Sequence, residues 1–464
     1  MTEISRHGEA SLFGTDGIRD RAGEGLLTDA HVERLVSATA HVLTSGAELL
    51  EYPPPDARTI LVARDTRQSG RALFKILAET FGGYGYVVKD LGVLPTPAVS
   101  YLATRWDSVA LGVVLSASHN PADYNGIKFF SWTGEKVSDE FETALSTAFW
   151  THRAPPETGD FSEPLSVATE AFEAYLKYLV GCCRRPERLQ GRSVALDTAN
   201  GATFRIAPAV FRSLGMNVVT LGDKPDGMNI NEACGALHPD KLADVVRGEK
   251  HTVGFCFDGD GDRMIPVGRS GSVFDGDHVL YLAARHLHAA GRLPRNTIVA
   301  TVMSNFGLEK ALSKHGLELL RTSVGDRHVY REMLEGGHVV GGEQSGHTIF
   351  LDDAKTGDGI LSAIRLLDAL ETDDLDLESE AGELQRFPQV LKNVRVKQKL
   401  PFEEFPAVQE AVEAAKGALA GAGRIVLRYS GTEPLARVMI EGPDEAVTEE
   451  LTDRICDAIR THMA

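Results

Sequence analysis

The feature that most constrains the fold of this chain is a repeated alternation of buried strand, helix and strand. In residues 59–93, an apolar run rich in β-branched side chains is followed by a polar loop, a helical pattern that we expect Gly82 and Gly83 to stop, and a second apolar run. A turn at residues 95–97 and another helical pattern come next. The same order recurs in residues 193–223 and 297–327. Sequential units of this kind form mostly parallel sheets with right-handed crossovers. We therefore predict an α/β fold with three similar α/β domains, repeating every ~100 residues, which is an ordinary domain size.

The last part of the chain follows a different pattern. After the acidic run 371–383, strand-like segments alternate with two helical patterns, which predicts a smaller α+β domain. The last helical pattern opens at residues 443–445 and continues with one apolar stripe, which predicts a helix packed on a core. A chain of 464 residues is also too long for a single core. We predict mixed, mostly parallel sheets in three domains followed by a C-terminal α+β domain, with boundaries at 1–158, 159–269, 270–383 and 384–464.

The charge of the chain limits its partners. Its formal net charge is −18, which argues against nucleic acid or an anionic membrane surface as the main partner. An anionic small-molecule substrate would need a locally basic site, so arginines inside polar loops become informative.

Cysteine usage and hydropathy point to a cytoplasmic location. The five cysteines are an odd number and lack metal-ligand spacing, which fits a reducing compartment. The first residues lack the apolar core of a signal peptide. No segment approaches the roughly 18 apolar residues that a membrane-spanning helix requires.

The stretch 111–130 is a buried strand that ends abruptly in a polar loop. Its loop contains two hydroxyl side chains, Ser116 and Ser118, followed by His119 and later by Lys128. In open α/β sheets, ligands bind at the carboxyl edge where such loops lie. Adjacent residues of an extended chain point apart, so we do not expect Ser118 and His119 to form a nucleophile and base pair. A polar turn whose serines only satisfy backbone groups remains an alternative.

The most specific pattern is FDGDGDR, residues 257–263. Asp258, Asp260 and Asp262 alternate with glycines, which allow the backbone to curl around a small cation. A set of oxygen ligands suits Mg²⁺. A calcium-binding EF-hand loop does not fit, because Arg263 and Arg269 occupy the places of its glycine and its bidentate glutamate. A solvated turn without a cation would leave three carboxylates repelling one another.

A second pattern, LRYSGTEPLAR in residues 427–437, suits a phosphate group. Arg428 offers a bidentate fork, Ser430 and Thr432 offer hydroxyl groups, and Gly431 allows consecutive backbone N–H groups to face an anion. The alternative is a decorated hairpin turn.

A third and weaker pattern is GGEQSGH, residues 341–347. Glu343 can accept hydrogen bonds from neighbouring hydroxyls, and Ser345 can both donate and accept them. This loop therefore suits a polyol such as a sugar ring. VGDR, residues 324–327, is weaker still. Together with the absence of a Walker A loop, a nucleophile elbow and an H-E-x-x-H motif, these patterns predict an enzyme that moves phosphate on a sugar. A catalytically silent sugar-phosphate sensor is the alternative from another class.

Five motifs in register resemble those of the α-D-phosphohexomutases, and the resemblance runs from about Phe13 to the C-terminus. The motifs are FGTDGIR (13–19), SASHNP with NGIK (116–128), FDGDGDR (257–263), GEQSGH (342–347) and RYSGTEP (428–434). The resemblance implies three similar α/β domains and a C-terminal α+β domain around a central cleft. We expect residues 12–20 to form a loop in an unusual backbone conformation, because the segment contains glycines. One departure from the family is Asp20, where the family usually has glycine, which leaves the shape of the Arg19 loop open.

The resemblance also implies roles for individual residues. Ser118 would be the phosphorylated serine and, with Asp258, Asp260 and Asp262, would bind Mg²⁺. Lys128, Arg19 and His347 match positions that handle protons or phosphate. Sugar hydroxyls and phosphate would be held by Arg263, Glu343, Ser345, Arg428, Ser430, Gly431, Thr432 and Arg437.

The implied activity is an isomerase reaction on a hexose phosphate. Gln344 within GEQSGH favours family members that interconvert glucosamine 6-phosphate and glucosamine 1-phosphate, with mannose or glucose phosphates as the alternative substrates. A glucose- or glucosamine-type 1,6-bisphosphate would be the intermediate and activator. The sequence does not specify the oligomeric state, and a homodimer is one option.

Overall fold

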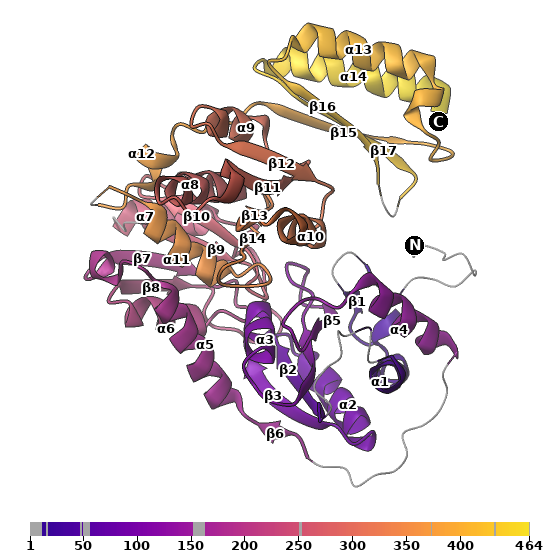
Figure 1. The fold of residues 1–464 in the computed structure, drawn as a ribbon, viewed down its shortest axis with the longest axis vertical. Coiled ribbons are helices and arrows are strands. Elements are labelled where there is room, and N and C mark those ends of the chain that lie inside the picture. The colour runs from indigo at the N-terminus through magenta and orange to yellow at the C-terminus, as the bar shows by residue number, and fades with distance from the viewer. Residues whose placement is uncertain are drawn as a thin grey trace.

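The computed structural model of the protein describes residues 12–14, 17–46, 49, 56–151, 163–249, 253–372, 374–430 and 433–463. These residues form one six-stranded sheet, two four-stranded sheets and one three-stranded sheet, each accompanied by helices (Figure 1). The predicted class, three α/β domains followed by a C-terminal α+β domain, is confirmed. The boundaries at residues 158, 269 and 383 stay predictions.

The first sheet has the strand order β1-β5-β4-β2-β3-β6. Its strands are β1 (Ile18–Arg21), β2 (Thr59–Arg64), β3 (Val87–Val93), β4 (Val109–Leu115), β5 (Tyr124–Ser131) and β6 (Leu165–Ser166). The accompanying helices are α1 (Asp29–Ser45), α2 (Gly70–Gly83), α3 (Thr96–Ala103) and α4 (Asp139–Thr151).

Strand β2 shows why this sheet is buried on both faces. Ile60 and Val62 belong to the core beneath α1, α2 and α4, whereas Leu61 and Ala63 belong to the core on the α3 face. Successive side chains of a strand point to opposite faces, so a continuous apolar run fills two cores at once.

The second sheet has the order β10-β9-β7-β8, and the third has the order β12-β11-β13-β14. The elements of the second domain are α5 (Ala168–Cys182), β7 (Ser193–Asp197), α6 (Ile206–Ser213), β8 (Asn217–Leu221), α7 (Asp240–Glu249), β9 (Val253–Phe257) and β10 (Met264–Gly268). Those of the third are α8 (Gly276–Ala289), β11 (Thr297–Thr301), α9 (Phe306–Ser313), β12 (Glu318–Thr322), α10 (Asp326–Gly336), β13 (Val340–Gly342), β14 (Thr348–Phe350), α11 (Gly359–Ala369) and α12 (Leu377–Ala381).

All three α/β sheets share one connectivity. Within each sheet, the order β3-β2-β4-β5, β8-β7-β9-β10 or β12-β11-β13-β14 places the first strand between the second and the third. The fourth strand then returns antiparallel to the third. The internal repeat predicted from the sequence is therefore a repeat of topology, and equivalent loops occupy equivalent edges of the three sheets.

The C-terminal domain is an antiparallel sheet covered by two helices. Its elements are β15 (Gln389–Arg395), α13 (Pro406–Leu419), β16 (Arg424–Tyr429), β17 (Leu435–Glu441) and α14 (Glu445–Met463). Val408 of α13, Val438 of β17 and Ile455 of α14 belong to a core that is separate from the others. In Figure 1 this domain lies beside the third domain and apart from the first.

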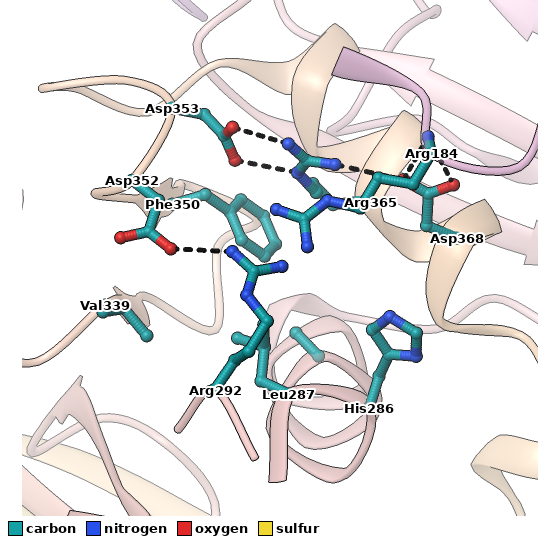
Figure 2. A pocket seen from close by; sticks show the side chains of 11 residues that line it. Arg184, His286, Leu287, Arg292, Val339, Phe350, Asp352, Asp353, Arg365 and Asp368 are labelled. Carbon is teal, nitrogen blue, oxygen red and sulfur yellow. Dashed lines mark hydrogen bonds and ion pairs between the residues drawn. The ribbon is translucent and has the colours of Figure 1, made fainter. Parts of the chain in front are cut away.

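One large core joins the first three domains, and buried ion pairs reinforce its edge. Side chains of α3, α5 and α11 belong to the same apolar cluster. Figure 2 shows Arg365 of α11 in a bidentate ion pair with Asp353, at 2.6 and 2.8 Å, while Asp368 accepts from the backbone N–H of Arg184. Arg365 also donates to the carbonyl oxygen of Cys182 at the end of α5. The second and third domains are thus fixed to each other.

The structure corrects one prediction about the N-terminal motif. Residues 12–20 were expected to form a loop, but Ile18–Arg21 form the edge strand β1, with Arg19 opposite Gly126 of β5. Only the described part of the motif can be compared, because residues 15 and 16 lie outside it. Pairing with a strand more than 100 residues away is a tertiary interaction, which a local pattern cannot reveal.

Two smaller differences concern element ends. Gly82 and Gly83 were expected to stop a helix, whereas both lie in the last turn of α2. Strand β6, in the segment predicted to open the second domain, pairs with β3 at the edge of the first sheet.

Candidate active site

Three of the predicted loops occupy the same place in three sheets. The segments 116–123, 258–263 and 343–347 each connect the third strand of a sheet to its antiparallel fourth strand. The structure brings them together: Ser118 Oγ donates to Asp258 Oδ2 at 2.7 Å, and His347 Nδ1 lies 3.7 Å from Asp262 Oδ2. A single site is therefore built from one repeated position in the fold.

The carboxylates of Asp258, Asp260 and Asp262 form a compact, buried cluster. Each offers an oxygen atom, and these atoms all lie within 4.8 Å of one another. Within the described residues, Asp260 Oδ1 and Asp262 Oδ1 are buried and have no hydrogen-bond partner. Buried oxygen atoms without donors are costly unless a cation binds them. This donor set fits a hard divalent cation such as Mg²⁺.

The loop reaches this shape because of its glycines. Gly261 has a φ of +72°, in the left-handed region that glycine adopts readily. At Gly259, a Cβ atom would lie 2.5 Å from the carbonyl oxygen of Ser118, so only glycine allows the two loops to come this close. The spacing D-G-D-G-D thus serves both the curl of the loop and its contact with the serine.

The burial and the crowding of these carboxyl groups change their pKa values. Burial, together with Asp262 and Asp260, raises the pKa of Asp258 well above its usual value. Burial also opposes ionisation of Asp262, but Lys128 and His347 outweigh it and lower the pKa of that carboxyl. At Asp258, the neighbouring groups of the protein do not offset the burial of the charge and its repulsion from the other two carboxylates. A bound cation would offset both.

Lys128 and a residue that the sequence analysis missed both contact Asp260. Lys128 Nζ lies 2.8 Å from Asp260 Oδ2 and 3.6 Å from Asp262 Oδ2, in a buried position. Thr96 Oγ1 donates to Asp260 Oδ2 at 2.6 Å. Thr96 was interpreted only as part of a turn before a helix, and nothing in its local sequence indicates a carboxylate 164 positions away.

His347 lies in a chain of charged groups that joins the three domains. Its Nε2 atom lies 3.3 Å from Asp326 Oδ2, and Lys136 Nζ lies 2.6 Å from the same oxygen. The N–H of Gly357 also points to Nε2, at 3.1 Å, which suits a neutral ring. Burial disfavours the charged ring too, but Asp326 and Asp262 outweigh it and raise the pKa of His347 to about 9. We assign the charged form, because two carboxylates act on the ring against one amide.

The same chain gives a place to VGDR, the weakest of the predicted motifs. Asp326 belongs to it, and Arg327 forms ion pairs with Asp139 and Glu142 of α4 in the first domain. Arg327 thus connects the third domain to the first, a role that its sequence did not indicate.

The structure separates the two serines that the sequence left equivalent. Ser116 is fully buried and its hydroxyl donates to Asp65 Oδ2 at 2.6 Å, whereas Ser118 Oγ faces Asp258. Ser118 has a φ of +51°. Alternation along an extended chain therefore does not apply here.

One consequence is a correction concerning His119. Its Nδ1 atom lies 3.3 Å from Ser118 Oγ, although the two side chains were expected to point apart. The left-handed conformation of Ser118 turns the chain and brings them together. Burial, with Arg263 and Arg19 nearby, lowers the pKa of His119 to about 4, so its ring is neutral at neutral pH.

Two predicted arginines lie near the serine and the carboxylates. Arg263 Nε lies 3.9 Å from Asp262 Oδ1, and both Arg263 and Arg19 act on His119. Asp20, the departure from the family pattern, lies in β1 and accepts from the backbone N–H of Leu26 at 3.0 Å. Asp20 therefore supports the turn after β1 and leaves Arg19 in the strand.

The predicted sugar loop lies next to the metal loop. Glu343 Oε1 accepts from the N–H of Gly325 at 3.1 Å, and Ser345 Oγ lies 3.4 Å from Glu343 Oε2. Gln344 Nε2 donates to Asp275 Oδ2 at 3.2 Å. Ser345 is exposed and Glu343 is partly so, which leaves polar atoms available to a ligand.

The predicted phosphate clamp lies on a separate domain. Arg437 Nη2 donates to Ser430 Oγ at 3.1 Å, and Arg428 projects from the neighbouring strand β16. Gly431 and Thr432 lie outside the described residues. Within the described part of the chain, the hydrogen bonds of this clamp stay inside its own surroundings, and none joins it to Ser118 or to the carboxylate cluster. The structure thus assembles three of the four predicted loops and holds the fourth apart.

None of the helices that the structure describes combines the length and the apolar character needed to cross a lipid bilayer.

Comparisons with known proteins agree with this geometry. Four models described as phosphoglucomutase/phosphomannomutase match the chain: α/β/α domain I at residues 10–155, domain II at 173–271, domain III at 275–387 and the C-terminal domain at 391–458. A phosphoglucosamine mutase of Symbiobacterium thermophilum is 43% identical over 455 residues, covering 97% of this chain and 99% of that protein.

A phosphoglucosamine mutase of Alkalilimnicola ehrlichii is also 43% identical, with 97% of each chain covered. Among solved structures, a phosphoglucomutase/phosphomannomutase family protein of Burkholderia thailandensis matches with a TM-score of 0.78 and 24% identity over 97% of each chain. That last comparison supports the fold.

Proposed function

The chain belongs to the phosphoglucomutase/phosphomannomutase family, and on this basis we propose that it interconverts glucosamine 6-phosphate and glucosamine 1-phosphate. The protein is an isomerase that moves a phosphoryl group within a sugar phosphate. The observation that supports the proposal most directly is the 2.7 Å hydrogen bond from Ser118 Oγ to Asp258, which places one hydroxyl against a buried carboxylate cluster.

In the proposed reaction, Ser118 carries the phosphoryl group between two transfers. The free hydroxyl oxygen of the sugar attacks the phosphorus of phosphorylated Ser118. A P–O bond to the sugar forms, the bond to Ser118 Oγ breaks, and the hydroxyl proton ends on Oγ. The resulting 1,6-bisphosphate reorients within the site, and Ser118 Oγ attacks the phosphorus of the other phosphoryl group. A P–O bond to Oγ forms, the P–O bond to the sugar oxygen breaks, and the Oγ proton ends on that sugar oxygen. This step restores phosphoserine and releases the isomeric monophosphate.

The carboxylate cluster would hold Mg²⁺. Asp258, Asp260 and Asp262 would supply oxygen ligands together with an oxygen atom of phosphorylated Ser118, and the cation would neutralise charge on the transferring group. The buried carboxylate oxygen atoms without hydrogen-bond partners support this assignment.

Cationic side chains around the serine would handle protons and phosphate. Lys128, buried between two of the carboxylates, and His347 would supply positive charge. Arg19 and Arg263 would contact the phosphoryl group, since both lie close enough to act on His119.

The sugar and its second phosphate would be held by the remaining loops. Glu343 and Ser345 would contact sugar hydroxyls, and the phosphate that does not react would bind the clamp, made of Arg428, Ser430, Gly431, Thr432 and Arg437. Because both ends of the bisphosphate must meet Ser118, the intermediate must reorient without leaving. A glucose- or glucosamine-type 1,6-bisphosphate would therefore also activate dephosphorylated enzyme.

Replacing the serine tests the carrier. We expect Ser118→Ala to lose the phosphate detected by intact mass and to lower turnover by roughly 10³-fold or more, while Ser313→Ala, an exposed position at the end of α9, leaves both unchanged. Full turnover by Ser118→Ala would rule out the mechanism.

A substrate panel tests the sugar. The wild-type protein should show its highest kcat/KM on glucosamine phosphates when glucosamine, glucose and mannose phosphates are compared. A higher value on mannose or glucose phosphate would assign the protein to the alternative activity within the same family. An absence of turnover on all three would instead identify a sugar-phosphate sensor.

A further inference from the structure

Arg67 is a fully buried arginine that the reaction just described does not use. It lies in the loop after β2, and none of its side chain is accessible to solvent. Its guanidinium donates to backbone carbonyl oxygens of the serine loop: Ser118 at 3.0 Å, Asn120 at 2.8 Å, Tyr124 at 3.0 Å, and Pro121. Every one of these acceptors lies between β4 and the start of β5.

The position of Arg67 follows from the topology. Strands β2 and β4 are parallel neighbours, so the loops at their carboxyl ends lie side by side. The guanidinium is planar and carries five N–H donors in a fixed fork. It can therefore bind several carbonyl oxygens at once and fix the path of the loop that carries them.

Asp65 orients Arg67 and links it to the serine from the other side. Arg67 Nε donates to Asp65 Oδ2 at 2.8 Å, and the Ser116 hydroxyl donates to the same oxygen at 2.6 Å. Ser116 Oγ in turn accepts from the backbone N–H of Ser118 at 3.0 Å. The N–H and the C=O of Ser118 are thus both held by one buried network.

A second side chain reaches the same carbonyl oxygens from the second domain. Asn231 Nδ2 donates to the carbonyl oxygen of Ser118 at 2.9 Å and to that of Asn120 at 3.1 Å. The carbonyl oxygen of Ser118 therefore accepts hydrogen bonds from side chains of two domains, Arg67 of the first and Asn231 of the second. The second domain also carries the carboxylate cluster.

The backbone of Ser118 needs such support. Its φ of +51° lies in the left-handed region, which residues other than glycine, asparagine and aspartate seldom adopt. A residue in that region persists only where its surroundings fix it. Its conformation also directs Oγ toward Asp258, so relaxation of the backbone would move the reacting oxygen.

We propose that Arg67, oriented by Asp65 and assisted by Asn231, is the positioning residue of the phosphoryl-carrying serine. It binds the carbonyl groups of Ser118 and Asn120 and thereby holds Ser118 Oγ against the metal-binding carboxylates. This inference rests on the proposed role of Ser118 as phosphoryl carrier. Arg67 touches neither substrate nor metal in this assignment, so its effect is on the rate of phosphoryl transfer and not on substrate affinity.

The first test compares two buried arginines. Arg67→Lys keeps the charge but cannot span several carbonyl oxygens. Arg365→Lys is the matched control, because Arg365 is also buried, is also ion-paired to aspartates and also binds a carbonyl oxygen, but lies at the interface of the second and third domains (Figure 2). Both variants are measured as purified full chains below their melting temperatures.

The decisive measurement is single-turnover transfer from phosphorylated Ser118 to saturating glucosamine phosphate. We expect Arg67→Lys to slow this step by about 10- to 100-fold with the half-saturating substrate concentration unchanged, since a displacement near 1 Å can cost about 100-fold. We expect Arg365→Lys to lower the melting temperature with the transfer rate unchanged. A wild-type transfer rate in Arg67→Lys, or an equal loss in both variants, would overturn the proposal.

Asn231→Gly provides a second test that does not disturb a buried charge. Asn231 has a φ of +61°, which glycine adopts without strain, so the substitution removes the amide donor and spares the backbone. We expect a smaller loss of transfer rate, about 3- to 10-fold. If Arg67→Lys does not fold, a wild-type rate in Asn231→Gly overturns the proposal. Failure of the proposed function is recognised separately, because it would abolish transfer in the wild-type protein as well.

Discussion

The serine and carboxylate loops differ from the C-terminal clamp in how completely the protein builds them. Ser118, Asp258 and Lys128 are almost inaccessible to solvent. Ser118 of the first domain donates to Asp258 of the second, and Lys128 of the first domain donates to Asp260 of the second. Arg428 and Arg437 are partly exposed. Burial and the neighbouring Arg437 lower the pKa of Arg428, so two like charges face a common space.

This contrast indicates that the C-terminal clamp is the part of the site that is completed only when a ligand binds. The core of the C-terminal domain is separate from the core that joins the first three domains, and its polar contacts run to the third domain, through Arg424 and Glu441 to Ser304 and Asn305. Domains with separate cores move relative to one another more readily. We expect the clamp to reach the transferring site by a hinge motion when phosphate binds.

Removal of the metal should have the largest effect, and it acts on the serine and carboxylate loops. Exhaustive treatment with EDTA is expected to abolish turnover because the carboxylate cluster would lose the cation that neutralises it, and added Mg²⁺ should restore it. Phosphate on Ser118, measured by intact mass, should survive the treatment. Full activity in metal-free protein would show that the cluster does not serve catalysis.

Substitution of a carboxylate in the cluster should have the next largest effect on activity. Asp260→Asn keeps the shape of the side chain but removes a charge that contacts Lys128, and we expect kcat to fall by roughly 10²- to 10³-fold. Asp107→Asn, at an exposed position of the first domain, is the control. An unchanged dependence of rate on Mg²⁺ concentration in Asp260→Asn would contradict its role as a ligand.

The clamp should respond differently to substitution. Arg428→Gln is expected to lower kcat/KM by about 10- to 100-fold, mainly through KM, because a charge-assisted bond to the non-reacting phosphate is lost. Arg395→Gln, on the exposed edge of β15, is the matched control. If Arg428→Gln lowered the phosphorylation of Ser118 while leaving KM unchanged, the separation between the two regions would be wrong.

The smallest expected effect is one of stability. The pKa of Asp258 is raised by burial and by its carboxylate neighbours, so above that pKa its ionised form disfavours the folded state when no cation is bound. Asp258→Asn should therefore raise the melting temperature of the metal-free protein by about 2 °C, although its activity is lost. A lower melting temperature than the wild type in EDTA would show that repulsion within the cluster is not significant.

Local sequence was sufficient to predict the features that depend on neighbouring residues. The alternation of Asp258, Asp260 and Asp262 with glycines predicted a cation site, and the structure places these carboxylates in a buried cluster of the right size. The final helix was also predicted from its apolar stripe, and α14 begins at Glu445 as expected. In both cases residues only a few positions apart carry the whole signal.

Apart from the pairing of Ser118 with the carboxylates, which the family resemblance implies, contacts between distant segments were not predicted. Thr96, Asp326 and Asn231 each bond to a residue of another domain, and nothing in their local sequences indicates these partners. Arg67 was visible only as part of a polar loop at a strand end. Its function depends on the parallel pairing of β2 with β4, which brings its guanidinium to the serine loop.

The sequence by itself determined the class of fold, the repeated unit and the candidate residues for the chemistry, because hydrophobic periodicity and short motifs are properties of neighbouring residues. Only the tertiary structure distinguished Ser118 from Ser116, brought His119 beside Ser118 and turned residues 18–21 into a strand. The physical reason is that a left-handed backbone, a buried hydrogen bond or a strand pairing is stabilised by partners far away in the chain, and those partners meet only when the chain has folded.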